Sequence, residues 1–105
     1  IERLPELAEQ AARRLAGYPN VEVRVGDGSL GCADEAPFDA IVVTAAASEV
    51  PAQLTDQLAE GGRLVIPVGR DRSVQQLLRI DKQDGELHEH AMGAVAFVPL
   101  VTDQP

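Results

Sequence analysis

The sequence has few aromatic residues, one cysteine and no long apolar run. Aromatic side chains make up only 3% of its 105 residues, so a core must be built from valine, leucine, isoleucine and alanine. Cys32 alone cannot form an internal disulfide, which indicates a reduced compartment. Apolar runs such as residues 40–43 and 64–67 are far too short to cross a bilayer, and no signal-peptide pattern opens the chain. We therefore expect a cytoplasmic protein.

Basic residues are scarce as well. Nine lysines and arginines stand against seventeen acids, which gives a net charge of −8. A chain with this balance is not attracted to phosphate backbones or to anionic lipid surfaces. The charge therefore argues against a nucleic acid or a membrane as a partner.

The length bounds the number of domains. A chain of 105 residues can enclose one hydrophobic core but not two, so we expect residues 1–105 to form a single domain. The apolar share of 45% is ordinary for a globular protein. A core made of aliphatic side chains suits parallel strands covered by helices.

Hydrophobic periodicity organises the first half of the chain. Apolar residues at helical spacing predict a helix over residues 4–16. Strict alternation predicts a strand over residues 21–25, which the turn Gly26-Asp27-Gly28 ends. The short continuous apolar run at residues 40–43 is typical of a strand that is buried on both faces.

The second half reads as a helix and three strands. Ser48 and Pro51 are helix-start signals and predict a helix from about residue 51 to residue 60. Residues 63–69 follow as a strand, in which Pro67 suggests that the far end lacks a neighbour on one side. Asp84-Gly85 is a hairpin signal, and it predicts two antiparallel strands, at residues 74–81 and 86–98.

Alternating strands and helices predict an α/β fold with a mostly parallel sheet and a C-terminal antiparallel hairpin. In open sheets of this kind, ligands bind at the carboxyl ends of the strands. Three strand ends therefore carry candidate chemistry: residues 26–28, 44–47 and 68–69.

Five blocks of sequence, in order, resemble the protein-L-isoaspartate O-methyltransferase family. They are residues 1–3, 25–28, 38–47, 61–69 and 97–100. The resemblance implies a Rossmann-like fold and transfer of a methyl group from S-adenosylmethionine to the free carboxylate of an isoaspartyl residue, in the repair of damaged proteins and peptides. A carboxylate is already a nucleophile and a sulfonium is already an activated leaving group, so catalysis can be mainly positioning and exclusion of water.

The resemblance also implies cofactor contacts. Glu2 matches the acid that accepts hydrogen bonds from the ribose hydroxyls; alternatively, it is an ordinary acid at a helix N-terminus. Asp27 matches the residue that meets the adenine edge, where small neighbours such as Gly28 let the backbone approach the ring; alternatively, it is a turn aspartate. Thr44 matches the end of the family's fourth strand, near the methyl donor.

Substrate contacts follow from the same resemblance. Ala45, Ala46 and Ala47 are small enough to leave room for a peptide backbone; without the family they would be a strand running into a loop. Val98 resembles the segment whose backbone meets the isoaspartyl substrate; as an isolated pattern it is only a strand end before proline. No metal site is expected, because His88 and His90 lack the further ligands that a metal needs.

The family's first strand carries a glycine-rich loop, and neither that loop nor the Ser/Thr-containing segment before it is found in these residues. Since the chain also starts at Ile1 rather than Met, we expect an incomplete fold with upstream sequence missing. We further expect the 105 residues alone to be inactive. Strand 21–25 would then pair with residues 40–44, or the chain would self-associate through exposed edges. The alternatives are a related methyltransferase with another substrate and a non-catalytic remnant that acts as a binding module.

Overall fold

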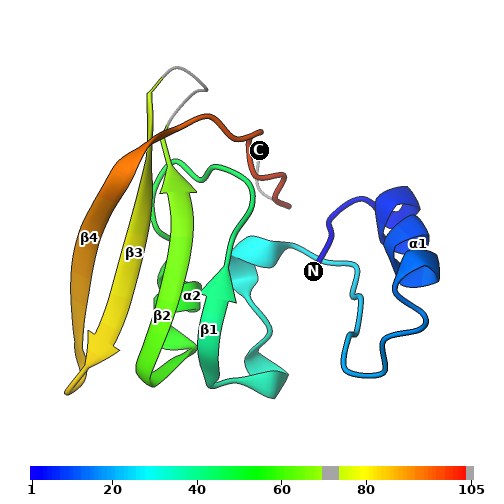
Figure 1. Ribbon diagram of the computed structural model, residues 1–105, viewed down its shortest axis with the longest axis horizontal. Coiled ribbons are helices and arrows are strands. Elements are labelled where there is room, and N and C mark those ends of the chain that lie inside the picture. The colour runs from blue at the N-terminus through cyan, green and yellow to red at the C-terminus, as the bar shows by residue number, and fades with distance from the viewer. Residues whose placement is uncertain (70–73, 104–105) are drawn as a thin grey trace. The chain divides into compact units, whose positions relative to one another are not determined.

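The computed structural model describes residues 1–69 and 74–103 of the chain (Figure 1). The chain folds as two compact units. The first contains residues Ile1–Gly28 together with Val101–Pro105, and the second contains Ser29–Leu100. No helix in the described part of the chain is both long and apolar enough to cross a membrane.

The first unit contains one helix, α1, at Pro5–Arg14. Proline is tolerated in the first turn because its missing N–H would have no intrahelical partner there. The charges suit the helix dipole, with Glu6 in the first turn and two arginines in the last. The predicted helix over residues 4–16 is therefore confirmed, with ends that are slightly shorter.

The strand predicted at residues 21–25 is wrong. Alternation is present, but the backbone makes only one isolated parallel bridge, between Val25 and Glu2. A strand needs partners along its length for its N–H and C=O groups. Residues 38–42 pair with another part of the second unit, so they do not supply that partner.

The second unit is built on a four-stranded sheet in the order β1-β2-β3-β4 (Figure 1). Its strands are Phe38–Val42, Leu58–Val68, Gln75–Gln83 and Glu86–Val95. β1 runs parallel to β2, and both other ladders are antiparallel. The predicted α/β fold with a closing hairpin is confirmed. The sheet that these four strands form is mixed rather than mostly parallel, because two of its three ladders are antiparallel.

Three short helices belong to the connections. The α-helix α2 covers Ala52–Asp56, and two 3-10 helices cover Gly28–Leu30 (η1) and Ala33–Glu35 (η2). The helix predicted from residue 51 to residue 60 therefore ends early. Leu58 already pairs with Phe38 of β1. The next pair in the register is Ala40 with Arg63, so the glycines between Leu58 and Arg63 lie in a bulge of the β1–β2 ladder. Cross-strand pairing thus overrides the helical pattern at residues 57–60.

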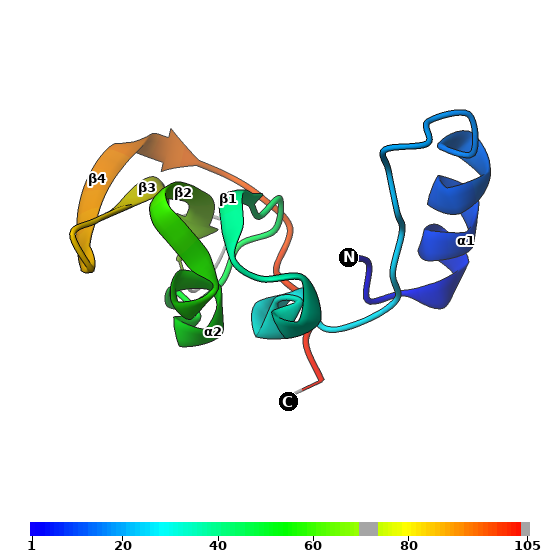
Figure 2. The same ribbon diagram turned by 90° about the horizontal axis from the view of Figure 1, so that it is seen from below.

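The core of this unit lies between the sheet and α2, which covers one face of it (Figure 2). Leu64 and Ile66 of β2 are 0% exposed and point to that face. Their register partners Ile80 and Leu78 on β3 continue the same layer. The buried cluster is aliphatic throughout, as the composition predicts: Ala47, Leu54, Leu58, Leu64, Ile66 and Ile80.

Pro67 does not mark a sheet edge, so that prediction is wrong. Proline 67 is fully buried in a central strand and pairs with Leu77 of β3. On its other side, its carbonyl oxygen accepts the N–H of Ala47 at 3.0 Å. The regular β1–β2 ladder ends at Val42 and Val65, where the next donor on β2 would have been the N–H that proline lacks.

The hairpin turn lies where the sequence predicts it. Asp84 and Gly85 both have positive φ, 54° and 74°, as a type I′ turn requires. The carboxylate of Glu60 accepts the backbone N–H groups of both residues, and the distance to Gly85 is 3.1 Å. This end of the β3–β4 hairpin is therefore fixed to β2 by a side chain.

Candidate functional site

The first unit places Glu2 and Asp27 on neighbouring parallel segments. The N–H of Glu2 donates to the carbonyl of Arg24 at 2.8 Å, and the N–H of Gly26 donates to the carbonyl of Glu2 at 3.0 Å. Glu2 therefore lies beside Val25 in a parallel bridge, and Asp27 follows two residues after Val25. Both acids stand where parallel segments end, which is the position that α/β sheets use for ligands.

Asp27 is a buried carboxylate, only 6% exposed. One of its oxygens, Oδ2, accepts the backbone N–H of Asp103 at 3.0 Å. The side chain of Asp103 in turn pairs with Arg3, with 2.6 Å between Nε and Oδ1. Asp103 is thus held beside Asp27. Gly28 follows it, and a Cβ added there would meet no atom within 4 Å, so this side of the loop is open.

The second unit brings the other candidate residues together. Thr44 is exposed and Ala45 is half-buried just beyond β1, whereas Ala46 and Ala47 are each only 7% exposed. Ala47 is held at the end of β2: its N–H donates to Pro67, and its carbonyl accepts the N–H of Gly69 at 2.8 Å. The segment that contains these small residues is therefore fixed by its backbone.

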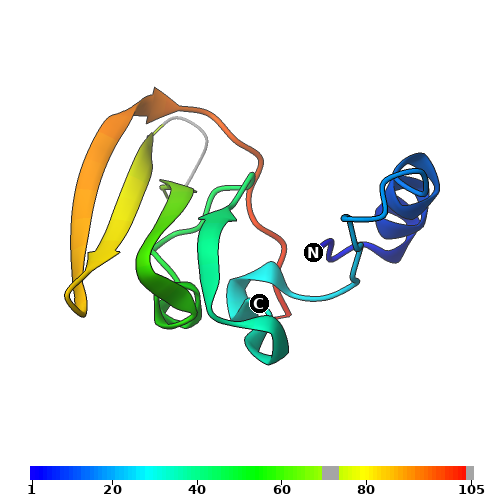
Figure 3. The same ribbon diagram turned by 60° about the horizontal axis from the view of Figure 1, so that its bottom comes forward.

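Val98 lies against the same segment, although it is far away in sequence. The N–H of Ala46 donates to the carbonyl of Val98 at 2.7 Å, and the N–H of Leu100 donates to the carbonyl of Ala46 at 2.9 Å. Val98 itself is 55% exposed. Figure 3 shows this late segment crossing from the end of β4 to the end of β1. The structure therefore places Thr44–Ala47 and Val98 side by side, and it places Glu2, Asp27 and Gly28 in the other unit.

Two glutamines that the sequence analysis did not single out hold loops in the second unit. Gln57 accepts the N–H of Cys32 at 2.8 Å and donates to the carbonyl of Leu30 at 3.0 Å. Gln75 makes the same kind of double contact with the backbone of Phe97. No motif surrounds either residue, and a polar side chain next to a strand ordinarily indicates a solvated position. The sequence therefore carried no signal for them.

Replacing Gly31 by alanine is expected to loosen the loop that Gln57 holds. Gly31 has φ +67°, and a Cβ there would lie 2.7 Å from Cδ of Gln57. Left-handed backbone at a residue other than glycine costs about 1–3 kcal/mol. Urea denaturation should show a loss of stability of that size. The matched control is Gly28→Ala, which meets open space and has no positive φ, so an equal loss there would contradict this account.

A family model described as protein-L-isoaspartate(D-aspartate) O-methyltransferase (PCMT) matches residues 1–105. The chain belongs to this family. The resemblance seen in the five blocks of sequence is therefore confirmed.

Curated relatives from archaea and bacteria agree with this assignment. Protein-L-isoaspartate O-methyltransferase of Methanoculleus marisnigri is 50% identical over 103 residues, which are 96% of this chain and 46% of that relative. The protein of the same name from Pyrococcus abyssi is 52% identical over 104 residues, which are 96% of this chain and 48% of that relative. The chain thus spans about half the length of the curated relatives it matches.

A solved structure extends the likeness to the fold. A putative protein-L-isoaspartate O-methyltransferase from Plasmodium falciparum, crystallised in complex with S-adenosyl-L-homocysteine, matches with a TM-score of 0.81 at 32% identity. The match covers 97% of this chain and 51% of that one. The predicted methyltransferase fold is therefore confirmed, and this chain corresponds to about half of it.

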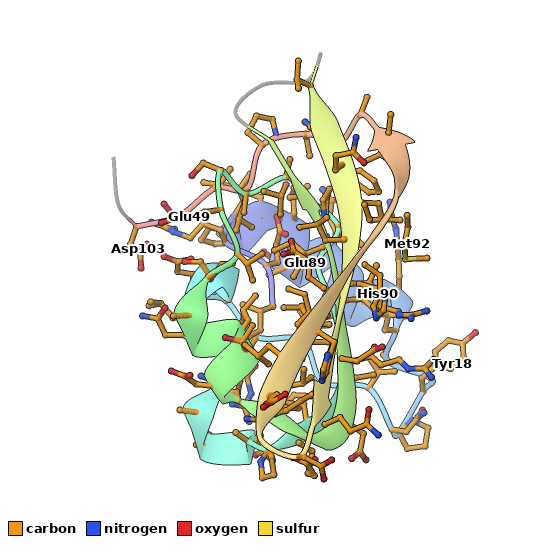
Figure 4. All side chains as sticks on the ribbon, turned by 90° about the vertical axis from the view of Figure 1, so that its left-hand side faces the viewer. Tyr18, Glu49, Glu89, His90, Met92 and Asp103 are labelled. Carbon is orange, nitrogen blue, oxygen red and sulfur yellow. The ribbon has the colours of Figure 1, made fainter. Side chains whose placement is uncertain are left out.

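Metal ligands are not clustered in the described part of this chain. Among residues 1–69 and 74–103, no three His, Cys, Asp or Glu side chains could hold an ion together. His90 instead lies 3.5 Å from Oδ2 of Asp81, and Figure 4 shows it pointing away from the side on which Glu89 projects. His88 lies 3.9 Å from Glu86. Both histidines thus approach carboxylates on the strands of the closing hairpin.

Proposed function

We propose that the protein containing this chain transfers a methyl group from S-adenosylmethionine to the free carboxylate of isoaspartyl residues in proteins and peptides. Membership of the family and the fold shared with a relative that binds S-adenosylhomocysteine support this proposal. One observation carries it for this chain. The backbone of Ala46 pairs with that of Val98, which joins the two segments that the family resemblance assigns to the substrate.

The residues of the first unit fit the adenosine part of the cofactor. Ribose hydroxyls and the adenine amino group are hydrogen-bond donors, and carboxylates accept such bonds strongly. Glu2 and Asp27 supply carboxylates at neighbouring segment ends, and the open side of Gly28 leaves room for a flat ring. In this proposal Glu2 binds the ribose, Asp27 and Gly28 bind the adenine, and Thr44 lies near the methyl donor.

At the substrate, the protein contributes positioning rather than reactive side chains. When bound, the cofactor supplies a methyl group on a positively charged sulfur, and the isoaspartyl carboxylate supplies the attacking oxygen. The protein must align the two and keep water out. Ala45, Ala46 and Ala47 present little side chain, so a peptide backbone can come close to them. Val98 offers an N–H group without a hydrogen-bond partner among residues 1–69 and 74–103.

Three further expectations belong to this proposal. Residues 1–105 form part of one methyltransferase domain, the enzyme works in the cytoplasm, and the chain by itself self-associates through exposed sheet edges. The 105 residues alone are expected to bind the cofactor weakly and to transfer no methyl group, because the proposed contacts reach only its adenosine part.

A methyl-transfer assay tests the function. The full protein is incubated with S-adenosylmethionine carrying a radiolabelled methyl group and a synthetic peptide that contains one isoaspartyl residue. We expect base-labile label in that peptide, since methyl esters hydrolyse readily, and none in a control peptide with ordinary aspartate. Equal labelling of both peptides would point to a related methyltransferase with another substrate. No labelling, together with no binding of S-adenosylhomocysteine, would point to a non-catalytic module.

A further inference from the structure

The side chain of Gln75 forms two hydrogen bonds with the backbone of one residue. Its Nε2 donates to the carbonyl of Phe97 at 3.0 Å, and its Oε1 accepts the N–H of Phe97 at 2.7 Å. Gln75 is only 3% exposed, although it is the first residue of β3. A buried amide with both of its functional groups satisfied is a well-defined contact, because leaving either one unmade would be costly.

The contact continues the sheet after its backbone pairing has ended. Gln75 pairs with Val95, the last residue of β4, so the backbone pairing with β3 ends two residues before Phe97. A side-chain amide has the same donor and acceptor as a peptide group. The amide of Gln75 therefore binds both backbone groups of Phe97, as a neighbouring peptide group could.

Little space remains in which this amide could move. A Cβ added at Gly69 would lie 2.7 Å from Cγ of Gln75, so the backbone immediately after β2 packs directly against its side chain. The position of Phe97 is therefore set from two sides. Gln75 holds Phe97, and Ala46 holds the carbonyl of the next residue, Val98.

We propose that Gln75 is a positioning residue for the isoaspartyl peptide. It fixes the Phe97–Val98 backbone against the Thr44–Ala47 segment, so that the exposed peptide group of Val98 meets the substrate in a set orientation. This inference rests on the proposed function, since it assigns a task to the same site. Without the amide, the Val98 segment would have to be ordered each time a peptide binds, at the expense of affinity.

Binding of a labelled peptide tests this role without requiring turnover. Fluorescence anisotropy gives the Kd of a labelled isoaspartyl peptide for the full protein in the presence of saturating S-adenosylhomocysteine. In Gln75→Met, which has a similar length and no hydrogen-bonding groups, we expect the peptide Kd to rise about tenfold. The Kd of S-adenosylhomocysteine, measured by calorimetry, should change by less than about twofold.

Glu60→Ala is the matched control. Glu60 also holds two backbone groups with one side chain, but it does so at the hairpin turn, at the other end of β3. This variant should lower the melting temperature and leave the peptide Kd unchanged. Gln75→Glu provides a second test should the methionine variant fail to fold: it keeps an acceptor for Phe97 N–H, loses the donor and is also expected to weaken peptide binding.

The outcomes separate the two proposals. A folded Gln75 variant that binds the peptide as tightly as the parent protein overturns the positioning role and leaves the proposed function intact. A parent protein that does not bind the isoaspartyl peptide at all overturns both. Equal weakening by Glu60→Ala would show that loss of stability alone accounts for the effect, and it would likewise overturn the role of Gln75.

Discussion

Replacing Leu64 by alanine is expected to lower the free energy of unfolding by about 3–5 kcal/mol, the upper part of the range for buried leucines. Leu64 is 0% exposed at the centre of β2, with Ile41 beside it on one strand and Ile80 on the other. All three side chains belong to or pack against the buried cluster. The surrounding strands cannot collapse into the gap, because hydrogen bonds fix their spacing on both sides.

A loss of this size matters for so small a unit. Native domains are stable by only about 5–15 kcal/mol, so the variant should retain little of its stability at growth temperature. Chemical denaturation measures the change, and Leu87→Ala is the matched control. Leu87 is 49% exposed on β4, so the same substitution there should cost less than about 1 kcal/mol. Similar losses at both positions would contradict the placement of the core.

Local patterns were sufficient for those parts of the fold whose partners are near in sequence or strongly constrained. The apolar run at residues 40–43 predicts a strand, and β1 forms there. The predicted burial on both faces is wrong, because Val42 is 69% exposed. Asp84-Gly85 predicts its turn because both residues tolerate positive φ. In each case the deciding physics is contained in a few neighbouring residues.

Patterns failed where a distant partner decides the outcome. Residues 21–25 alternate strictly between apolar and charged side chains, yet only Val25 of this segment forms a bridge, and its partner is Glu2. Residues 57–60 continue a helical pattern, but pairing with Phe38 draws Leu58 into β2. Periodicity describes which face a residue can present, and it contains no information about whether a neighbouring strand will be there to receive it.

The candidate site shows the same division. The family resemblance named Ala46 and Val98 separately, and their direct pairing is visible only in the folded chain. Gln75 was missed altogether, because its role depends on where β4 leaves the sheet rather than on its own neighbours. The sequence therefore yields candidate residues for the site, while the contacts that hold those residues in place appear only in the folded chain.

Asp27→Ala is expected to weaken binding of S-adenosylhomocysteine to the full protein by roughly 10- to 100-fold, the effect of losing a hydrogen bond to a charged group. The proposed partner of Asp27 is the adenine amino group, and the methyl side chain of alanine cannot accept a hydrogen bond from it. Isothermal calorimetry measures the Kd directly. The residues proposed to bind the peptide belong to the other unit, so the affinity for the peptide at saturating cofactor should change far less.

The contact between Asp27 and the backbone N–H of Asp103 supplies a competing explanation, because alanine removes that contact too. Asp27→Asn separates the two. Its amide oxygen can still accept from Asp103, while its amino group turns a donor toward the adenine donor, so cofactor binding should remain weak. Asp103→Ala keeps the backbone N–H and loses only the ion pair with Arg3, an exposed pair worth about 0–1 kcal/mol. Asp103→Ala should therefore bind the cofactor normally. The opposite pattern would be a loss of cofactor affinity in Asp103→Ala as large as in Asp27→Ala, with normal affinity in Asp27→Asn. In that case Asp27 would serve to hold Asp103 rather than the adenine.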